Sequence, residues 1–169
     1  DLVRSRGLGD VYKRQGKNKG NFIVGRMSSD NLNIVTTTIT NAQMLTLRAS
    51  PITLVTAQGT GTVVELVSAM LFCDASAGVY TESADNMQIK YVDGSGVAVT
   101  ADIESTGFVT VADEMATTVI PKIDAIATDA QCVNQPLVLH NVGDGEFGGG
   151  NAANDMVCKV AYRVHAPGF

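Results

Sequence analysis

The stretch Thr62–Cys73 reads Thr-Val-Val-Glu-Leu-Val-Ser-Ala-Met-Leu-Phe-Cys and is the longest apolar run of the chain. Its β-branched and aromatic residues suit the pleated surface of a strand. Turn-forming residues flank it, Gly59–Gly61 before and Asp74–Ser76 after. The run therefore predicts a central strand. A buried helix over Val63–Phe72 is the alternative, because periodicity alone does not separate the two for a short apolar run.

Both faces of this predicted strand are largely apolar. Strict alternation places Val64, Leu66, Met70 and Phe72 on one face and Val63, Val67, Ala69 and Leu71 on the other, with Glu65 and Ser68 as the polar interruptions. Such a strand is typical of parallel sheets, and an antiparallel strand reaches the same state between a core and a partner subunit. The second apolar face therefore favours self-association.

The first residues of the chain are expected to be foreign to the domain. Ser5–Gln15 resembles the translation of a transposase-type sequencing adapter over eleven consecutive residues. We therefore interpret residues 1–15 as an adapter-derived or disordered segment on a metagenomic gene fragment whose true start lies upstream. A basic arm for nucleic acid is the alternative interpretation of the same residues. Residues 16–32 are expected to form an N-terminal arm or linker, followed by one β-sandwich domain over 33–169.

The charge of the chain limits its partners. It has 12 basic and 17 acidic residues, a formal charge of −5, and 8 basic and 15 acidic residues remain without segment 1–15. An acidic chain without clustered Lys and Arg argues against nucleic-acid binding. No apolar run approaches the roughly 20 residues that cross a bilayer, so no membrane partner is expected.

The three cysteines, Cys73, Cys132 and Cys158, are odd in number and lack the spacing of a metal site. We expect reduced, buried thiols that pack as small apolar groups, as in a protein assembled in a reducing cytoplasm. A disulfide between Cys132 and Cys158 is the alternative.

Seven further segments have the composition or alternation of strands. They are Asn33–Ile39, Ile52–Ala57, Asn86–Val92, Val97–Glu104, Ala116–Ile120, Gln135–Asn141 and Met156–His165. About eight strands at this spacing predict an all-β fold, an antiparallel β-sandwich that is jelly-roll-like. Short helical turns are expected after the capping residue Thr40, running to Leu47, and as weaker candidates over Ala112–Thr117 and within Lys122–Gln131.

Two pairs of neighbouring strands are expected to form hairpins. Ile52–Ala57 is separated from the central run only by a Gly-containing turn. Asn86–Val92 and Val97–Glu104 flank the sequence Asp-Gly-Ser-Gly, in which Gly94 and Gly96 can adopt the positive φ of a tight turn.

The residues with chemical potential form no recognisable catalytic motif. A metal site would need His140 with Asp144 and Glu146, which we interpret instead as polar residues on the rim of a loop. Asp93–Gly96 lacks the alternating oxygen ligands of a calcium loop, and Gly143–Gly150 lacks the Lys-Ser/Thr ending of a phosphate loop. We therefore expect no enzyme activity, no cofactor, and no catalytic or metal-binding residue.

From Pro51 onward, a series of short motifs covers about two thirds of the chain. They are Pro51–Val55 with Gly59–Gly61, Tyr91–Gly96, Ile103–Phe108, Leu137–Asn141, Gly149–Ala153 and Val160–His165. These motifs resemble a family of small virion-type proteins of tailed phages and prophages from environmental sequence. Members tend to be encoded among virion genes, so the resemblance implies a component of a phage particle. The motifs look structural, and the resemblance implies no active residue.

The leading functional prediction is a phage virion structural protein, made in the host cytoplasm, that decorates a capsid or forms part of a head or tail fibre. It is expected to be a homo-oligomer, with a trimer favoured, and to bind phage capsid or tail proteins. The alternative is a carbohydrate-binding module that uses the loops 75–84 and 142–154 to bind host glycans. A cupin-like metalloenzyme using His140 with Asp144 or Glu146 is the third hypothesis.

Overall fold

A computed structural model describes residues 31–82 and 85–168 of the chain. The expected adapter-derived segment 1–15, and the expected arm 16–32 except for its last two residues, lie outside this part. From Asn31 onward the chain forms one compact unit. Antiparallel strands and two short helices build the described part, so the predicted all-β class is confirmed.

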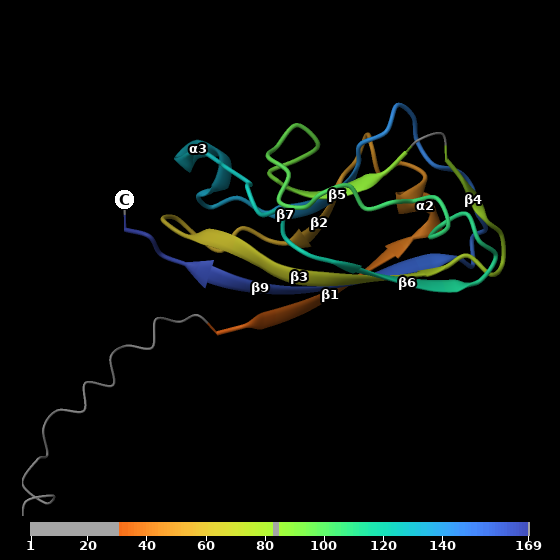
Figure 1. Cartoon of the computed structure of the whole chain (residues 1–169), viewed down its shortest axis with the longest axis horizontal. Coiled ribbons are helices and arrows are strands. Elements are labelled where there is room, and N and C mark those ends of the chain that lie inside the picture. Colours follow the sequence, from red (N-terminus) through yellow and green to blue (C-terminus); the bar gives the residue numbers. More distant parts are fainter. Residues whose placement is uncertain (1–30, 83–84, 169) are drawn as a thin grey trace, which may run out of the picture. The chain divides into compact units, whose positions relative to one another are not determined.

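Two sheets face each other across the core, as Figure 1 shows. The four-stranded sheet has the order β1 (Asn33–Thr40), β9 (Asp155–His165), β3 (Val63–Asp74) and β6 (Glu114–Val119). The three-stranded sheet has the order β2 (Ile52–Val55), β7 (Leu137–Asn141) and β5 (Met87–Tyr91). A separate short pair consists of β4 (Tyr80–Thr81) and β8 (Gly148–Gly149).

Three of the strand pairs are nested, with the first strand paired to the last, and the pairing of β3 with β9 and of β5 with β7 joins the nested pairs into the two sheets. β1 pairs with β9, β2 with β7, and β3 with β6. At the centre of the chain, β5 is bridged to the next segment through Ala98 and Ile103. This is the pairing of one long antiparallel ribbon rolled into two facing sheets. It matches the two Greek keys of a jelly roll, so the predicted jelly-roll-like sandwich is confirmed.

The central run is the strand β3, and the helical alternative over Val63–Phe72 is wrong. Its pairing with β9 shifts between Leu66 and Ser68, which marks a β-bulge at Val67. The extra residue reverses the direction of every side chain beyond it. The buried side chains are therefore Val64 and Leu66 before the bulge, and Ala69, Leu71 and Cys73 after it. The predicted faces are wrong for this reason, because strict alternation places Met70 with Val64.

One of the two predicted hairpins is present. β2 and β3 lie in different sheets, so the hairpin expected between them is wrong; the chain crosses between the layers there. The return of segment 97–103 along β5 is confirmed, since the N–H of Val99 donates to the Ile89 carbonyl at 2.9 Å, but isolated bridges join the two, and the predicted regular strand Val97–Glu104 is wrong. Its turn places Val92, at φ 67°, in the left-handed region. Gly96 is needed for space instead, because a Cβ there would lie 1.6 Å from the Tyr91 carbonyl oxygen.

The helices are short and local. α2 (Asn41–Met44) begins after Thr40, whose side chain forms the predicted N-cap together with Gln43. α3 (Asp129–Cys132) lies at the end of the connection where a helical turn was a candidate. The candidate helix over Ala112–Thr117 is wrong, because most of these residues belong to the strand β6.

The core fills the space between the two sheets. Its largest fully buried side chains include Ile39, Met44, Leu47, Leu71, Met87, Ile89, Leu137, Leu139 and Met156. Burial of each such side chain stabilises the fold by about 1.5–3 kcal/mol. Cys73 and Cys158 are buried within this core and Cys132 is partly exposed, all three as free thiols.

Candidate functional site

The two loops expected to bind glycans, 75–84 and 142–154, are joined in the structure. Their strands β4 and β8 pair, with Tyr80 opposite Gly149. The rings of Tyr80 and Phe147 are buried and attach the loops to the core. Neither ring is therefore available as a stacking platform for a sugar.

Carboxylates line a depression of about 310 Å³ between these loops. Glu82 and Asp85 belong to it, and Glu146 forms part of the opposite side. The Thr106 hydroxyl donates to Glu82 at 2.6 Å, and the N–H of Gly145 donates to Asp85 at 3.1 Å. These acids thus hold loop backbone and neighbouring side chains in place.

Glu146 has a comparable structural role toward the segment after α2. Its two carboxylate oxygens accept the backbone N–H groups of Arg48 and Ala49 at 2.9 and 2.8 Å. Asp144 is exposed. The described residues contain no group of three His, Cys, Asp or Glu side chains able to hold a metal ion, so His140, Asp144 and Glu146 are not assembled as a ligand set.

His140 lies in a second depression, on the outer side of the three-stranded sheet, because its β7 neighbours Leu137 and Leu139 point into the core. We call this depression the Arg48 pocket. It measures about 440 Å³ and is lined by Arg48, Ala49, Pro51, Asp93, Gly94, Ser95 and His140.

The His140 side chain is nearly enclosed, with 8 % of the residue exposed. The turn backbone packs on its ring so closely that a Cβ on Gly94 would lie 2.6 Å from Nε2. Nδ1 is buried and forms no close, well-aligned hydrogen bond in the described part of the chain, and a weaker interaction of the ring with the Arg48 backbone only partly opposes the lowering of its pKa. Burial, and after it the ammonium of Lys90, lowers the pKa of the imidazole below its usual 6.5, so the ring is neutral at pH 7.

Of the charged groups around this ring, Lys90 and Asp93 already form hydrogen bonds within the chain, whereas Arg48 does not. Lys90 Nζ donates to the Gly94 carbonyl at 2.8 Å. The Asp93 carboxylate accepts the N–H and hydroxyl of Ser95 at 2.8 and 2.7 Å, and these bonds hold its pKa below the usual range. Within the described residues, the guanidinium of Arg48 has neither a hydrogen bond nor an ion pair.

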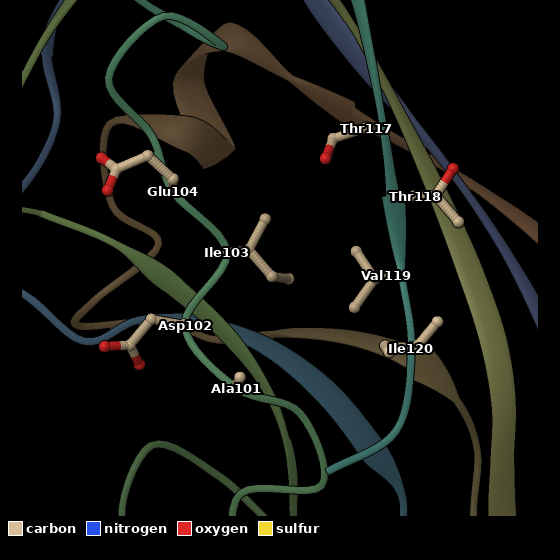
Figure 2. Close-up of a pocket in the computed structure, with 8 residues that line it drawn as sticks. All are labelled: Ala101, Asp102, Ile103, Glu104, Thr117, Thr118, Val119 and Ile120. Carbon is tan, nitrogen blue, oxygen red and sulfur yellow. The ribbon is translucent and has the colours of Figure 1, made fainter.

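A narrow groove of about 190 Å³ lies where the two sheets approach along segment 101–104 and the end of β6. Figure 2 shows Ile103 and Val119 pointing toward each other across it, while Asp102 and Glu104 point away. Both apolar side chains are buried. The groove is thus closed by core side chains, and its acidic residues do not converge on a common point.

The outer face of the four-stranded sheet carries the large apolar side chains that are exposed on the described strands. Ile34, Met70 and Phe72 are 70 %, 40 % and 36 % exposed on it. The Lys159 ammonium lies 5.6 Å from the centre of the Phe72 ring and covers part of it. We call this surface, centred on Met70 and Phe72, the outer face.

Charged residues bound the outer face at both ends of β3. At one end, Asp74 lies opposite Glu114 on β6 and opposite Asp155 on β9. At the other end, a carboxylate oxygen of Glu65 lies 2.7 Å from Nε2 of His165 and 3.6 Å from the guanidinium of Arg163. The apolar centre thus has the charged rim that is usual for interfaces.

Comparison with known proteins gives no assignment: no family model, curated protein or solved structure matches the chain. The two helices of the described part are each four residues long and fall short of a membrane span.

The sequence pointed to His140 and to the Asp93–Gly96 turn separately, and it gave no reason to place Arg48 or Lys90 beside them. Arg48 precedes β2, Lys90 and Asp93 belong to β5 and the turn after it, and the pairing of β2, β7 and β5 brings these groups to His140. No spacing of residues in the sequence predicts this cluster. The Gly-containing turn after β5 is visible in the sequence, but that it covers His140 follows only from the tertiary fold.

Proposed function

We propose that this protein is a non-enzymatic structural component of a phage particle, either a capsid decoration protein or part of a head or tail fibre. It would be made in the host cytoplasm and act by self-association and by binding capsid or tail proteins. The observation that carries the proposal is the outer face, where Ile34, Met70 and Phe72 stand exposed on one regular sheet. Large apolar side chains that remain exposed on the face of a regular sheet are a feature of association surfaces.

Two further observations support this proposal. Jelly rolls with two facing sheets are widely used by viral capsid proteins, although the same architecture also serves lectins. The motifs from Pro51 onward resemble virion-type proteins of tailed phages. We favour a trimer, because a closed ring of copies would cover the outer face of each copy without leaving an open end.

Native mass spectrometry of the full chain at micromolar concentration tests self-association. We expect a species of three times the mass of one chain. Met70→Glu with Phe72→Glu should shift it to the monomer, because two carboxylates would be buried in the interface beside a single ammonium, that of Lys159. Ile123→Glu is the matched control, since Ile123 is fully exposed in a connection away from this sheet. A wild-type monomer under these conditions contradicts the proposal.

A carbohydrate-binding module is the second candidate. The pairing of β4 with β8 favours it, because that pairing forms one carboxylate-lined depression from the two loops expected to bind glycans. Carboxylates can accept hydrogen bonds from sugar hydroxyls. A glycan array probed with the full chain tests this candidate, and an array without binding removes it.

A further inference from the structure

The Arg48 pocket places an exposed guanidinium and a buried imidazole beside acids that are already hydrogen-bonded. Within residues 31–82 and 85–168, the guanidinium of Arg48 is exposed and has no partner in the chain, and Nδ1 of the buried His140 forms no close, well-aligned hydrogen bond. By contrast, the carboxylates of Asp93 and Glu146 each accept two short hydrogen bonds from the chain itself. The Arg48 guanidinium is therefore the donor of this pocket that a ligand can reach without breaking a contact of the chain.

The charges facing His140 can be named from every element packed around it. Lys90 of β5 and Arg48 of the segment after α2 are the cations, and Glu146 of the loop after β7 and Asp93 of the turn are the anions. The four charges nearly cancel. Net charge therefore gives the pocket little selectivity, and the fork of the Arg48 guanidinium is left as the feature that would orient a ligand.

We propose that the Arg48 pocket binds the carboxylate of a small organic acid, with the Arg48 guanidinium as its principal donor and His140 as a proton acceptor that charges when the ligand binds. A guanidinium matches a carboxylate with two parallel hydrogen bonds. The pocket volume of about 440 Å³ lies in the usual range for small-molecule sites. This site lies on the three-stranded sheet and is independent of the self-association proposed above.

Binding at this site is coupled to protonation. Burial and Lys90 hold the pKa of His140 low in the empty pocket, so its ring is neutral at pH 7. A bound carboxylate adds a negative charge beside the ring and raises that pKa. By linkage, binding takes up a proton, and the affinity for the carboxylate rises as the pH falls toward the pKa of the empty site.

NMR titration of the full chain at constant ionic strength tests the proposal with acetate, glucuronate, glucose and inorganic phosphate. We expect acetate and glucuronate to shift the Gly94 and Ser95 amide signals with dissociation constants of about 1 mM or weaker, as suits an open pocket. Affinity should be about threefold or more higher near pH 5.5 than near pH 7.5. Glucuronate binding more tightly than acetate would identify an acidic sugar, and equal binding would identify the carboxylate alone.

Two variants and one control complete the test. Arg48→Gln keeps the backbone N–H that Glu146 holds and should weaken acetate binding about tenfold or more. Arg163→Gln, on the other sheet, should leave it unchanged. His140→Gln should remove the pH dependence, and the ring signals of wild-type His140 report the same effect if that variant does not fold. Binding unaffected by Arg48→Gln, glucose binding as tightly as glucuronate, phosphate binding as tightly as acetate, or an affinity independent of pH would each overturn the proposal.

Discussion

Among single residues, Gly94 shows how the absence of one side chain lets a turn close over a buried ring. A Cβ at this position would lie 2.6 Å from Nε2 and 2.9 Å from Cδ2 of His140. Gly94 does not have a positive φ, so steric contact and not backbone conformation requires the glycine. The sequence predicted Gly94 as a turn residue that adopts a positive φ. That reason is wrong, because the glycine is required by its contact with His140, which belongs to another strand.

Gly94→Ala should destabilise the fold by about 1–3 kcal/mol, the usual cost of forcing extra volume into a packed site. Urea unfolding followed by circular dichroism measures it. In a His140→Ala background the same substitution should cost much less, since the ring it strikes is gone. Equal costs in both backgrounds would show that the contact with His140 is not the cause.

The three thiols should differ in reactivity because they differ in burial. Burial raises the pKa of Cys73 to about 11 and of Cys158 to about 12, and the carboxylates of Asp74 and Asp155 add to the first effect. Burial and the Asp129 carboxylate raise the pKa of Cys132 as well, but this thiol is partly exposed, so a reagent can reach it. Near pH 8, a maleimide should label Cys132 of the folded chain about a hundredfold faster than either of the other two. Mass spectrometry of timed samples measures this, and three equal rates would contradict the burial described here.

Among the elements, composition and alternation were sufficient to place strands but not to pair them. The alternating residues of Asn86–Val92 and Met156–His165 predicted β5 and β9 correctly. The prediction of a hairpin between β2 and β3 is wrong because it was based only on the closeness of the two strands in the sequence. In the folded chain, hydrogen bonds to β7 and β9 satisfy those two strands better than a local turn would.

The bulge at Val67 leaves only a weak mark in the sequence. Strict alternation places the polar residues Glu65 and Ser68 on opposite faces, whereas the bulge brings both to the outer face, and the many apolar residues around them hide this difference. The same ambiguity explains why the second apolar face was assigned to the wrong side chains. It remains true that the outer face of β3 carries apolar residues, namely Met70 and Phe72.

A pair of truncations tests the bulge directly. Leu71→Ala should destabilise the fold by about 2–5 kcal/mol, because Leu71 is fully buried and its loss leaves a cavity. Met70→Ala should change the stability of the monomeric chain by less than about 1 kcal/mol, since Met70 is 40 % exposed on a single copy, and the measurement is made at concentrations low enough to keep the chain monomeric. Denaturant unfolding of the two variants side by side measures the difference. The reverse order would mean that Met70, and not Leu71, faces the core.

For the molecule as a whole, the chain folds as a rolled ribbon whose ends meet. β1 and β9 pair along their whole shared length, from Asn33 opposite Tyr162 to Thr40 opposite Asp155. Every strand of the four-stranded sheet therefore depends on partners distant in the sequence. The same arrangement explains why the Arg48 pocket escaped sequence analysis, since its residues meet only after the ribbon has rolled.

This topology predicts slow folding. Contacts between distant strands require the closure of long loops before any stabilisation is gained, and such proteins fold in about milliseconds to seconds. Stopped-flow refolding from urea should give a rate in that range. Met70→Ala, on the solvent side of β3, should leave the rate nearly unchanged, whereas Ile39→Ala in β1 should slow folding only if the pairing of β1 with β9 forms in the transition state. Refolding faster than about 100 microseconds would be inconsistent with a fold in which the first strand pairs with the last.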